Sequence, residues 1–258
     1  MSDLTFFLPD GMTVAGTAIV LATAMAAAGL TAALGLGGGL ILLAIMTAVM
    51  PIAAVIPVHG VAQLGSNAGR SLLQWRHVVW PVVAWFALGG VIGTAVGSQV
   101  LVAIPAALLK IGVALFVLWS VWGPTLNVPR PGIRAFFATG IIGSFLTLFF
   151  GATGPIAASV IGRAGFDRFA TTGTHGACML VQHLLKVLAF GALGFAYGPW
   201  AGFIVAVVLS GLVGTWIGTR VLLTLPEQQF RAGFKIALTA IALWLLVSAG
   251  MAGLTALA

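Results

Sequence analysis

Charged residues are scarce in this chain, and acidic residues are the scarcest. Of its 258 residues, 61% are hydrophobic, 6% are charged and only 4 are acidic. A soluble domain carries about 25% charged residues, so the composition excludes an ordinary soluble domain and predicts a protein solvated by lipid. The lack of acids also argues against an intramembrane hydrolase, because no carboxylate accompanies a histidine and a serine in the polar segments described below.

Cysteine is almost absent as well. The one cysteine, Cys178, excludes an internal disulfide, and its sequence neighbours indicate no metal cluster, so we expect a small buried packing residue. The net charge of +7 comes from basic residues scattered singly or in pairs between apolar runs. This pattern indicates topology markers at membrane surfaces rather than a nucleic-acid interface. We predict no metal site and no cofactor.

Long uncharged segments predict several membrane spans. No charged residue occurs between Asp10 and Arg70, which leaves room for more than one span of about 20 residues. The N-terminal region carries Asp3 and Asp10, and its apolar run from Met12 is too long for a signal peptide, so we expect a first transmembrane helix there. The apolar segments expected in the first half cover residues 12–34, 40–50, 78–102 and 106–122.

The second half of the sequence repeats the first. At an offset of 116, FATG…LTLFFGATG aligns with LATA…LTAALGLGG, and at an offset of 121, residues 210–226 align with residues 89–105. Agreement spread over the whole chain indicates a duplication. We predict an all-α integral membrane protein with two homologous halves, residues 1–123 and 133–258, joined by a linker at 124–132.

The two halves are expected to be inverted. Each has four long segments plus a short one, at 40–50 and 152–163, and five crossings per half give the halves opposite orientations. With both termini in the periplasm, most arginines face the cytoplasm, as the positive-inside rule requires. If the short segments re-enter the membrane instead, each half has four crossings and the halves are parallel. The inverted arrangement suits Arg163 and Arg168 better.

Two segments carry a polar stripe at helical spacing. The stripe of the second half comprises Thr171, His175, Gln182, His183 and Lys186, and that of the first half comprises His59, Gln63, Ser66, Asn67 and Arg70. Residues at these spacings lie on one face of a helix. We expect the first of these helices to start near Pro57, because proline is tolerated in a first turn, and this places His59 in that turn.

The cations of the stripes are candidates for anion binding. Lys186 has no acidic neighbour in the sequence, and an intramembrane cation usually faces a cavity or a partner. A bound anion would supply the missing countercharge. Snorkelling to a membrane surface is the alternative for Lys186, and a cytoplasmic helix-end position beside Arg76 is the alternative for Arg70.

The histidines of the stripes suit both anion binding and proton coupling. His59 and His175 lie near expected helix breaks, where backbone N–H groups attract anions, and imidazole changes charge near neutral pH. Hydrogen bonding between packed helices is the alternative. Further candidates to line the same cavity are Gln63, Asn67, Thr171, Thr174, Gln182 and His183. For these, bonds between helices or within one helix explain the sequence about equally well.

Glycines precede both short segments. Gly37, Gly38, Gly151 and Gly154 belong to GLGGG (35–39) and GATG (151–154), where the backbone can approach an anion closely. No Walker lysine follows either run and no strand is expected before it, so nucleotide binding is dismissed. Tight helix crossing explains these glycines equally well.

In these features the chain resembles the TauE/SafE family of sulfite and organosulfonate exporters. The resemblance rests on GLGGG after the first span, on the HG pairs at 59–60 and 175–176, and on the two halves of four to five helices. It covers essentially the whole chain. It implies export of small sulfur-containing anions across the bacterial inner membrane and assigns no individual binding residue.

Together these observations predict a secondary carrier for a small oxyanion, with a central site between the two halves. Lys186 and Arg70 supply positive charge in this hypothesis, while His59 and His175 bind the anion and exchange a proton. The expected partners are the anion and the lipid bilayer, and self-association into a homo-oligomer stays open. The alternatives are a passive anion channel on the same scaffold and a membrane haem protein with His59 and His175 as axial ligands, although no redox motif accompanies them.

Overall fold

The computed structural model describes residues 7–34, 37–101, 106–124, 130–221, 235–236 and 238–247, and within these ranges the chain is helical and contains no strand. Five of the described helices are long and apolar enough to cross a membrane, and they cover Val14–Thr31, Trp80–Leu101, Ile133–Phe150, Phe169–Ala192 and Gly198–Ile217. The predicted all-α membrane fold is therefore confirmed.

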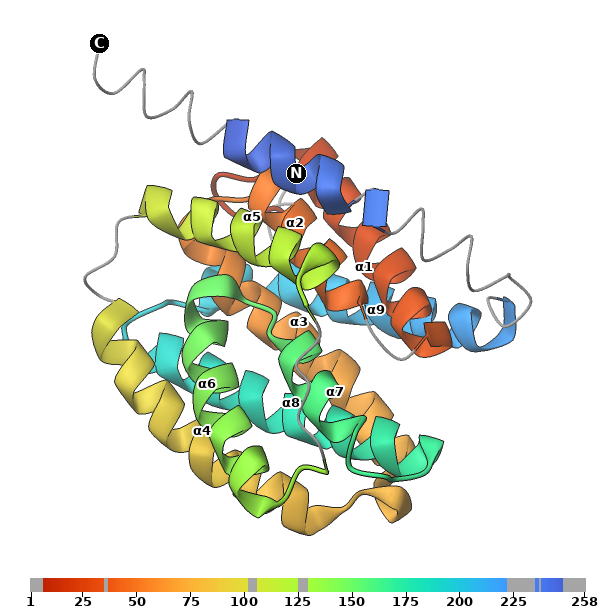
Figure 1. The fold of residues 1–258 in the computed structure, drawn as a ribbon. Coiled ribbons are helices and arrows are strands. Elements are labelled where there is room, and N and C mark those ends of the chain that lie inside the picture. Colours follow the sequence, from red (N-terminus) through yellow and green to blue (C-terminus); the bar gives the residue numbers. More distant parts are fainter. Residues whose placement is uncertain are drawn as a thin grey trace. The chain divides into compact units, whose positions relative to one another are not determined.

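The helix bounds follow the apolar segments of the sequence (Figure 1). In chain order the elements are α1 (Val14–Leu34), α2 (Gly38–Val49), α3 (Ile52–Leu73), η1 (Trp75–His77), α4 (Trp80–Leu101), α5 (Ala106–Trp122), α6 (Ile133–Phe150), α7 (Gly154–Ile161), α8 (Arg168–Ala192), η2 (Gly198–Trp200) and α9 (Ala201–Val221). The expected segments at 12–34, 40–50, 78–102 and 106–122 correspond to α1, α2, α4 and α5, with ends that differ by two residues at most.

The predicted helix start near Pro57 is wrong. α3 begins at Ile52 and continues through Pro57, so His59 lies beyond the first turn. Pro57 has no N–H to donate to the carbonyl of Ala53. Only this one bond near the start of the helix is lost, because the apolar residues before the proline already form a turn. Pro57 therefore removes one hydrogen bond from the helix and does not break it.

The helices form two compact units, and each unit combines segments of both sequence halves. The α1–α9 unit consists of Met1–Ile56, Ile104–Pro124 and Gly198–Ala258, and the α4–α6 unit consists of Pro57–Ala103 and Thr125–Tyr197. The predicted halves 1–123 and 133–258 were defined by similarity of sequence, and they do not coincide with the two compact units. The duplication and its inverted orientation remain predictions.

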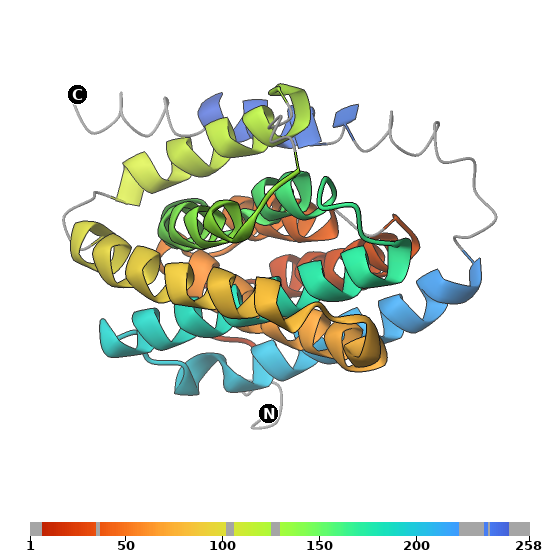
Figure 2. The ribbon, with the colours of Figure 1, turned by 60° about the horizontal axis from the view of Figure 1, so that its bottom comes forward.

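In each unit, a helix of the first half packs closely on a helix of the second half. α4 lies alongside α6 in the α4–α6 unit (Figures 1 and 2), and a Cβ atom at Gly93 would clash with the carbonyl oxygen of Ile141. α1 packs on α9 in the other unit, where a Cβ atom at Gly214 would clash with the carbonyl oxygen of Met25. Glycine at such positions lets two backbones touch, as is usual in membrane helix pairs.

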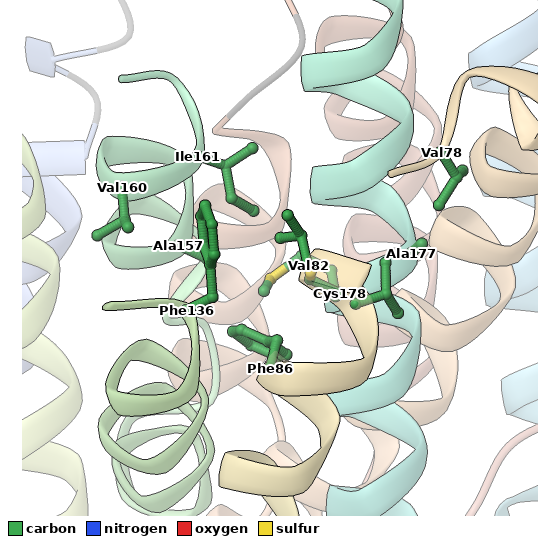
Figure 3. Packing of buried hydrophobic residues seen from close by; sticks show 11 residues of the cluster. Val78, Val82, Phe86, Phe136, Ala157, Val160, Ile161, Ala177 and Cys178 are labelled. Atoms are coloured by element: carbon green, nitrogen blue, oxygen red, sulfur yellow. The ribbon is translucent and has the colours of Figure 1, made fainter. Parts of the chain in front are cut away.

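An apolar cluster joins α4, α6, α7 and α8 within the α4–α6 unit (Figure 3). Phe86 of α4, Phe136 of α6, Ala157 of α7 and Cys178 of α8 are all buried in it. Cys178 is fully buried as a free thiol, which confirms its predicted packing role. The cluster fixes α7 and α8 against the tightly packed α4–α6 pair.

The helices α2 and α7 are too short to cross a membrane alone. α2 has 12 residues and α7 has 8, which correspond to lengths of about 18 and 12 Å, whereas the hydrocarbon core is about 30 Å thick. The chain leaves regular helix at Gly151–Thr153 before α7 and again after Ile161. Its polar groups therefore need partners from the protein.

Replacing Gly93 by alanine is expected to lower the free energy of unfolding by roughly 1–3 kcal/mol, because the added Cβ forces α4 away from α6. Thermal unfolding of the purified protein in detergent measures this as a lower midpoint temperature. Gly132→Ala is the matched control, since a Cβ at Gly132 meets no atom within 4 Å. Equal midpoints for the two variants would contradict the close approach.

Candidate functional site

The polar stripe of α8 faces the break between α6 and α7. Three stripe residues bond to this break: Lys186 Nζ donates to Gly151 O at 2.8 Å, Gln182 Nε2 donates to Thr153 Oγ1 at 2.8 Å, and His175 Nε2 lies 3.2 Å from Gly154 O. The contacts run in opposite order along the two segments, so the break lies antiparallel to α8. The predicted stripe and the predicted glycine run GATG are thus parts of one arrangement.

Lys186 is buried without a countercharge in the described part of the chain. Its side chain is 0% exposed, and it forms no ion pair there. Asp167 caps the start of α8 by accepting from Ala170 N at 2.8 Å, and it lies 19 residues before Lys186, about 28 Å along the helix. Full burial also speaks against snorkelling. An ammonium group in this position is costly unless another negative group joins it.

Two glycines make room for the two cations of the stripes. A Cβ at Gly60 of α3 would lie 2.8 Å from Cε of Lys186, and a Cβ at Gly176 of α8 would lie 3.3 Å from Nε of Arg70. Each HG pair therefore places its glycine beside the cation of the other helix. Because Gly60 faces Lys186 while Arg70 faces Gly176, α3 and α8 run antiparallel.

The buried histidines do not all meet. His59 is 0% exposed, and its ring centroid lies 6.1 Å from that of His183 at an interplanar angle of 80°. His175 lies 8 residues before His183, about 12 Å along α8 from the level at which His59 approaches that helix. Two axial ligands must reach one iron, so this spacing does not support the haem alternative.

The residues of the first stripe bond within their own helix. Asn67 Nδ2 donates to Gln63 O at 2.8 Å, and Nη2 of Arg70 donates to Oδ1 of Asn67. Gln63 and Arg70 are half-buried, and Asn67 is buried. Arg70 lies in the last turn of α3 but packs on Gly176, so it is not simply a helix-end charge in water.

The two predicted threonines lie at the start of α8. Thr174 Oγ1 accepts from Val79 N at 2.9 Å, which anchors the segment that leads into α4. Thr171 Oγ1 donates to Phe166 O at 3.3 Å. These bonds give both threonines a role in holding α8 to its surroundings.

The remaining predicted glycines, Gly37 and Gly38, belong to the α1–α9 unit. Gly37 precedes α2 with φ of 103°, a left-handed conformation that favours glycine. A Cβ at Gly38 would clash with the carbonyl oxygen of Ala27, and its N–H donates to Thr31 Oγ1 at 3.1 Å. These contacts account for both glycines through the packing of α1 on α2.

Sequence reasoning missed Thr153. Its hydroxyl donates to Gly143 O at 2.9 Å and accepts from Gln182, and the side chain is fully buried. The available signal was the offset of 116, at which Thr153 corresponds to Gly37, so only the second half has a hydroxyl there. Oε1 of Gln182 and Nδ1 of His183 are among the buried side-chain atoms that have no hydrogen-bond partner in the described ranges.

Comparison with known proteins identifies a family. The model of a family described as "Sulfite exporter TauE/SafE" matches residues 20–245, a range that contains both polar stripes and the α6–α7 break. No curated protein and no solved structure matches the chain.

The variant Lys186→Met is expected to unfold at a higher temperature than the wild type, by a few degrees. It removes a buried charge that lacks a countercharge and keeps most of the apolar volume, and buried ions replaced in this way often leave a protein more stable by roughly 1–4 kcal/mol. Thermal unfolding in detergent without added anion checks the sign. A clearly lower midpoint would show instead that Lys186 mainly holds the α6–α7 break in place.

Proposed function

The chain belongs to the sulfite exporter TauE/SafE family, and from this membership we propose that it is a secondary carrier that exports sulfite or a related small sulfur oxyanion. It is a multi-pass membrane protein. We place it in the bacterial inner membrane with both termini in the periplasm, the orientation that puts most arginines on the cytoplasmic side. It moves its substrate without chemical change.

The observation that carries the proposal is the buried ammonium of Lys186. Of its three N–H groups, one is bonded to Gly151 O within the described ranges. The other two N–H groups are available to a negatively charged ligand. Charge-assisted bonds to an oxyanion would offset the cost of burying the cation. A sulfur oxyanion has several acceptor oxygens and a small size, which suits a site enclosed by helices.

Both sequence halves contribute to this site within the α4–α6 unit. α8 supplies Lys186 and Gln182, the α6–α7 break supplies backbone carbonyls, and α3 supplies the space at Gly60. Broken helices that meet at a substrate site are a recurring feature of transporters with internal repeats. The second half provides most of the polar contacts, so we assign the larger share of binding to it.

Sulfite efflux from proteoliposomes tests the proposal. Lys186→Met is expected to lower kcat/KM for sulfite by roughly 10- to 100-fold or more, the loss that follows when a charged hydrogen-bond donor is removed from a ligand. Lys110→Met is the matched control, because Lys110 lies on α5, in the other unit, with its ammonium 5.7 Å from the Trp244 ring centroid. Equal transport by wild type and Lys186→Met would remove the proposed site. Flux that does not saturate with sulfite would indicate a channel.

We further propose that His175 couples transport to protons. It lies on the same stripe as Lys186 and approaches the carbonyl of Gly154 at the other end of the break. Efflux by the wild type is expected to change when a pH gradient is imposed, and His175→Gln is expected to reduce that response while it still transports sulfite. His77→Gln, a change at an exposed histidine of η1, serves as the control. A full response in His175→Gln would assign the coupling to another group.

A further inference from the structure

We infer that the site takes its anion in the form that carries one O–H group, hydrogensulfite rather than the sulfite dianion, and that Oε1 of Gln182 accepts the hydrogen bond from this O–H. The inference rests on the proposed function and concerns the same site. It makes Gln182 the residue that selects the protonation state of the substrate.

The orientation of the Gln182 amide follows from its partner. Thr153 Oγ1 has a single hydrogen, and it donates this hydrogen to Gly143 O at 2.9 Å. Thr153 can then only accept from Gln182, so the group that faces it at 2.8 Å is the amide NH2. The carbonyl oxygen of the same amide is therefore directed away from Thr153.

This oxygen is buried and has no partner. The Gln182 side chain is 0% exposed, and Oε1 forms no hydrogen bond within the described ranges. Oε1 lies beside Gly143, where a Cβ would be only 3.0 Å from it. Because this residue is glycine, no side chain at that position covers the oxygen. A buried acceptor without a donor is costly and rare in native proteins, which points to a donor that arrives with a ligand.

Gln182 and Lys186 contact the same helix break. They are four residues apart on α8, which places them on one face of the helix, and both bond to the three-residue break at 151–153. In the proposed complex, the anion binds the two N–H groups of Lys186 that have no partner in the described ranges and also contacts Oε1. An acceptor oxygen repels a bare anionic oxygen but stabilises an O–H. Hydrogensulfite, with one negative charge and one O–H, matches one cation and one acceptor.

The other titratable groups near Gln182 are few. On α8 they are Lys186, His175, His183 and Cys178, with Arg168 at the start of the helix, and on α3 they are His59 and Arg70; α4 and α7 contain none, and α6 contains Arg134 only, in its first turn. Within the described ranges these helices contain no Asp or Glu, so no carboxylic acid on them donates an O–H to Oε1. A pH effect that arises from a histidine would not depend on Gln182.

Exchange of labelled sulfite tests the inference. The wild-type protein is reconstituted in vesicles of phosphatidylethanolamine and phosphatidylglycerol, with the same pH on both sides, and KM is measured at several pH values around neutrality. The expected KM rises with pH when it is expressed as total sulfite and stays constant when it is expressed as hydrogensulfite. A KM that is constant only when expressed as the dianion overturns the inference without any variant.

Variants then assign the selection to Gln182. Gln182→Met is expected to lower kcat/KM by roughly 10- to 100-fold at the acidic end and to lose the dependence on the hydrogensulfite fraction. Sulfate, a dianion without an O–H, should compete poorly with the wild type and better with this variant. The control is Ser144→Ala, which removes a fully buried hydroxyl that has no partner in the described ranges. This variant should keep the wild-type dependence of KM on pH. If Gln182→Met keeps that dependence, the inference fails.

The two levels of failure are distinguishable. Absence of sulfite exchange by the wild type at every pH overturns the proposed function and this inference with it. Full exchange by Lys186→Met removes the proposed site, and the inference with it, but not the transport of sulfite. Exchange that requires Lys186 but ignores the hydrogensulfite fraction overturns only the inference.

Discussion

The candidate site depends on one polar contact in an apolar setting, the bond from the Lys186 ammonium to the carbonyl of Gly151. In lipid, neither a free carbonyl nor a free cation is tolerated, because water is not present to solvate them. The break between α6 and α7 exposes the carbonyl, and α8 brings the cation to it. Each group lessens the cost of the other, but a charge remains that the described residues do not neutralise. That residual charge is what makes this helix break a place for an anion.

The relation between α3 and α8 gives this contact its geometry. Gly60 accommodates the stem of Lys186, and Gly176 accommodates Arg70, so the two helices exchange the same type of contact in opposite directions. If α3 and α8 are the equivalent helices of the predicted duplication, their antiparallel course requires the two halves to be inverted. The stripes differ in chemistry in spite of this relation. Asn67 of α3 bonds to Gln63 and Arg70 of its own helix, whereas Gln182 and Lys186 of α8 reach across to the α6–α7 break.

The helices were predictable because a long apolar segment in lipid must satisfy its own backbone hydrogen bonds, which favours a helix, and because proline and glycine mark where such segments end. α1, α2, α4 and α5 begin and end where the hydrophobic runs do. The polar stripe of α8 was also predictable, since helical spacing places His175, Gln182 and Lys186 on one face. The partners of that face were not, because a bond such as that between Gln182 and Thr153 joins residues 29 positions apart through backbone geometry that spacing does not encode. The start of α3 was missed for a local reason, as the cost of Pro57 is small near a helix end.

The division of the packing into two units has a consequence for the order in which the chain matures. α4 is synthesised before α6, and α1 long before α9, yet each packs through glycine on the later partner. Until that partner is inserted, the face of α4 that carries Gly93 and the face of α1 that meets Gly214 are covered only by lipid or by other proteins. Neither half of the chain therefore completes a unit on its own. When the first half enters the membrane, the partners α9 and α6, on which α1 and α4 pack, have not yet been synthesised.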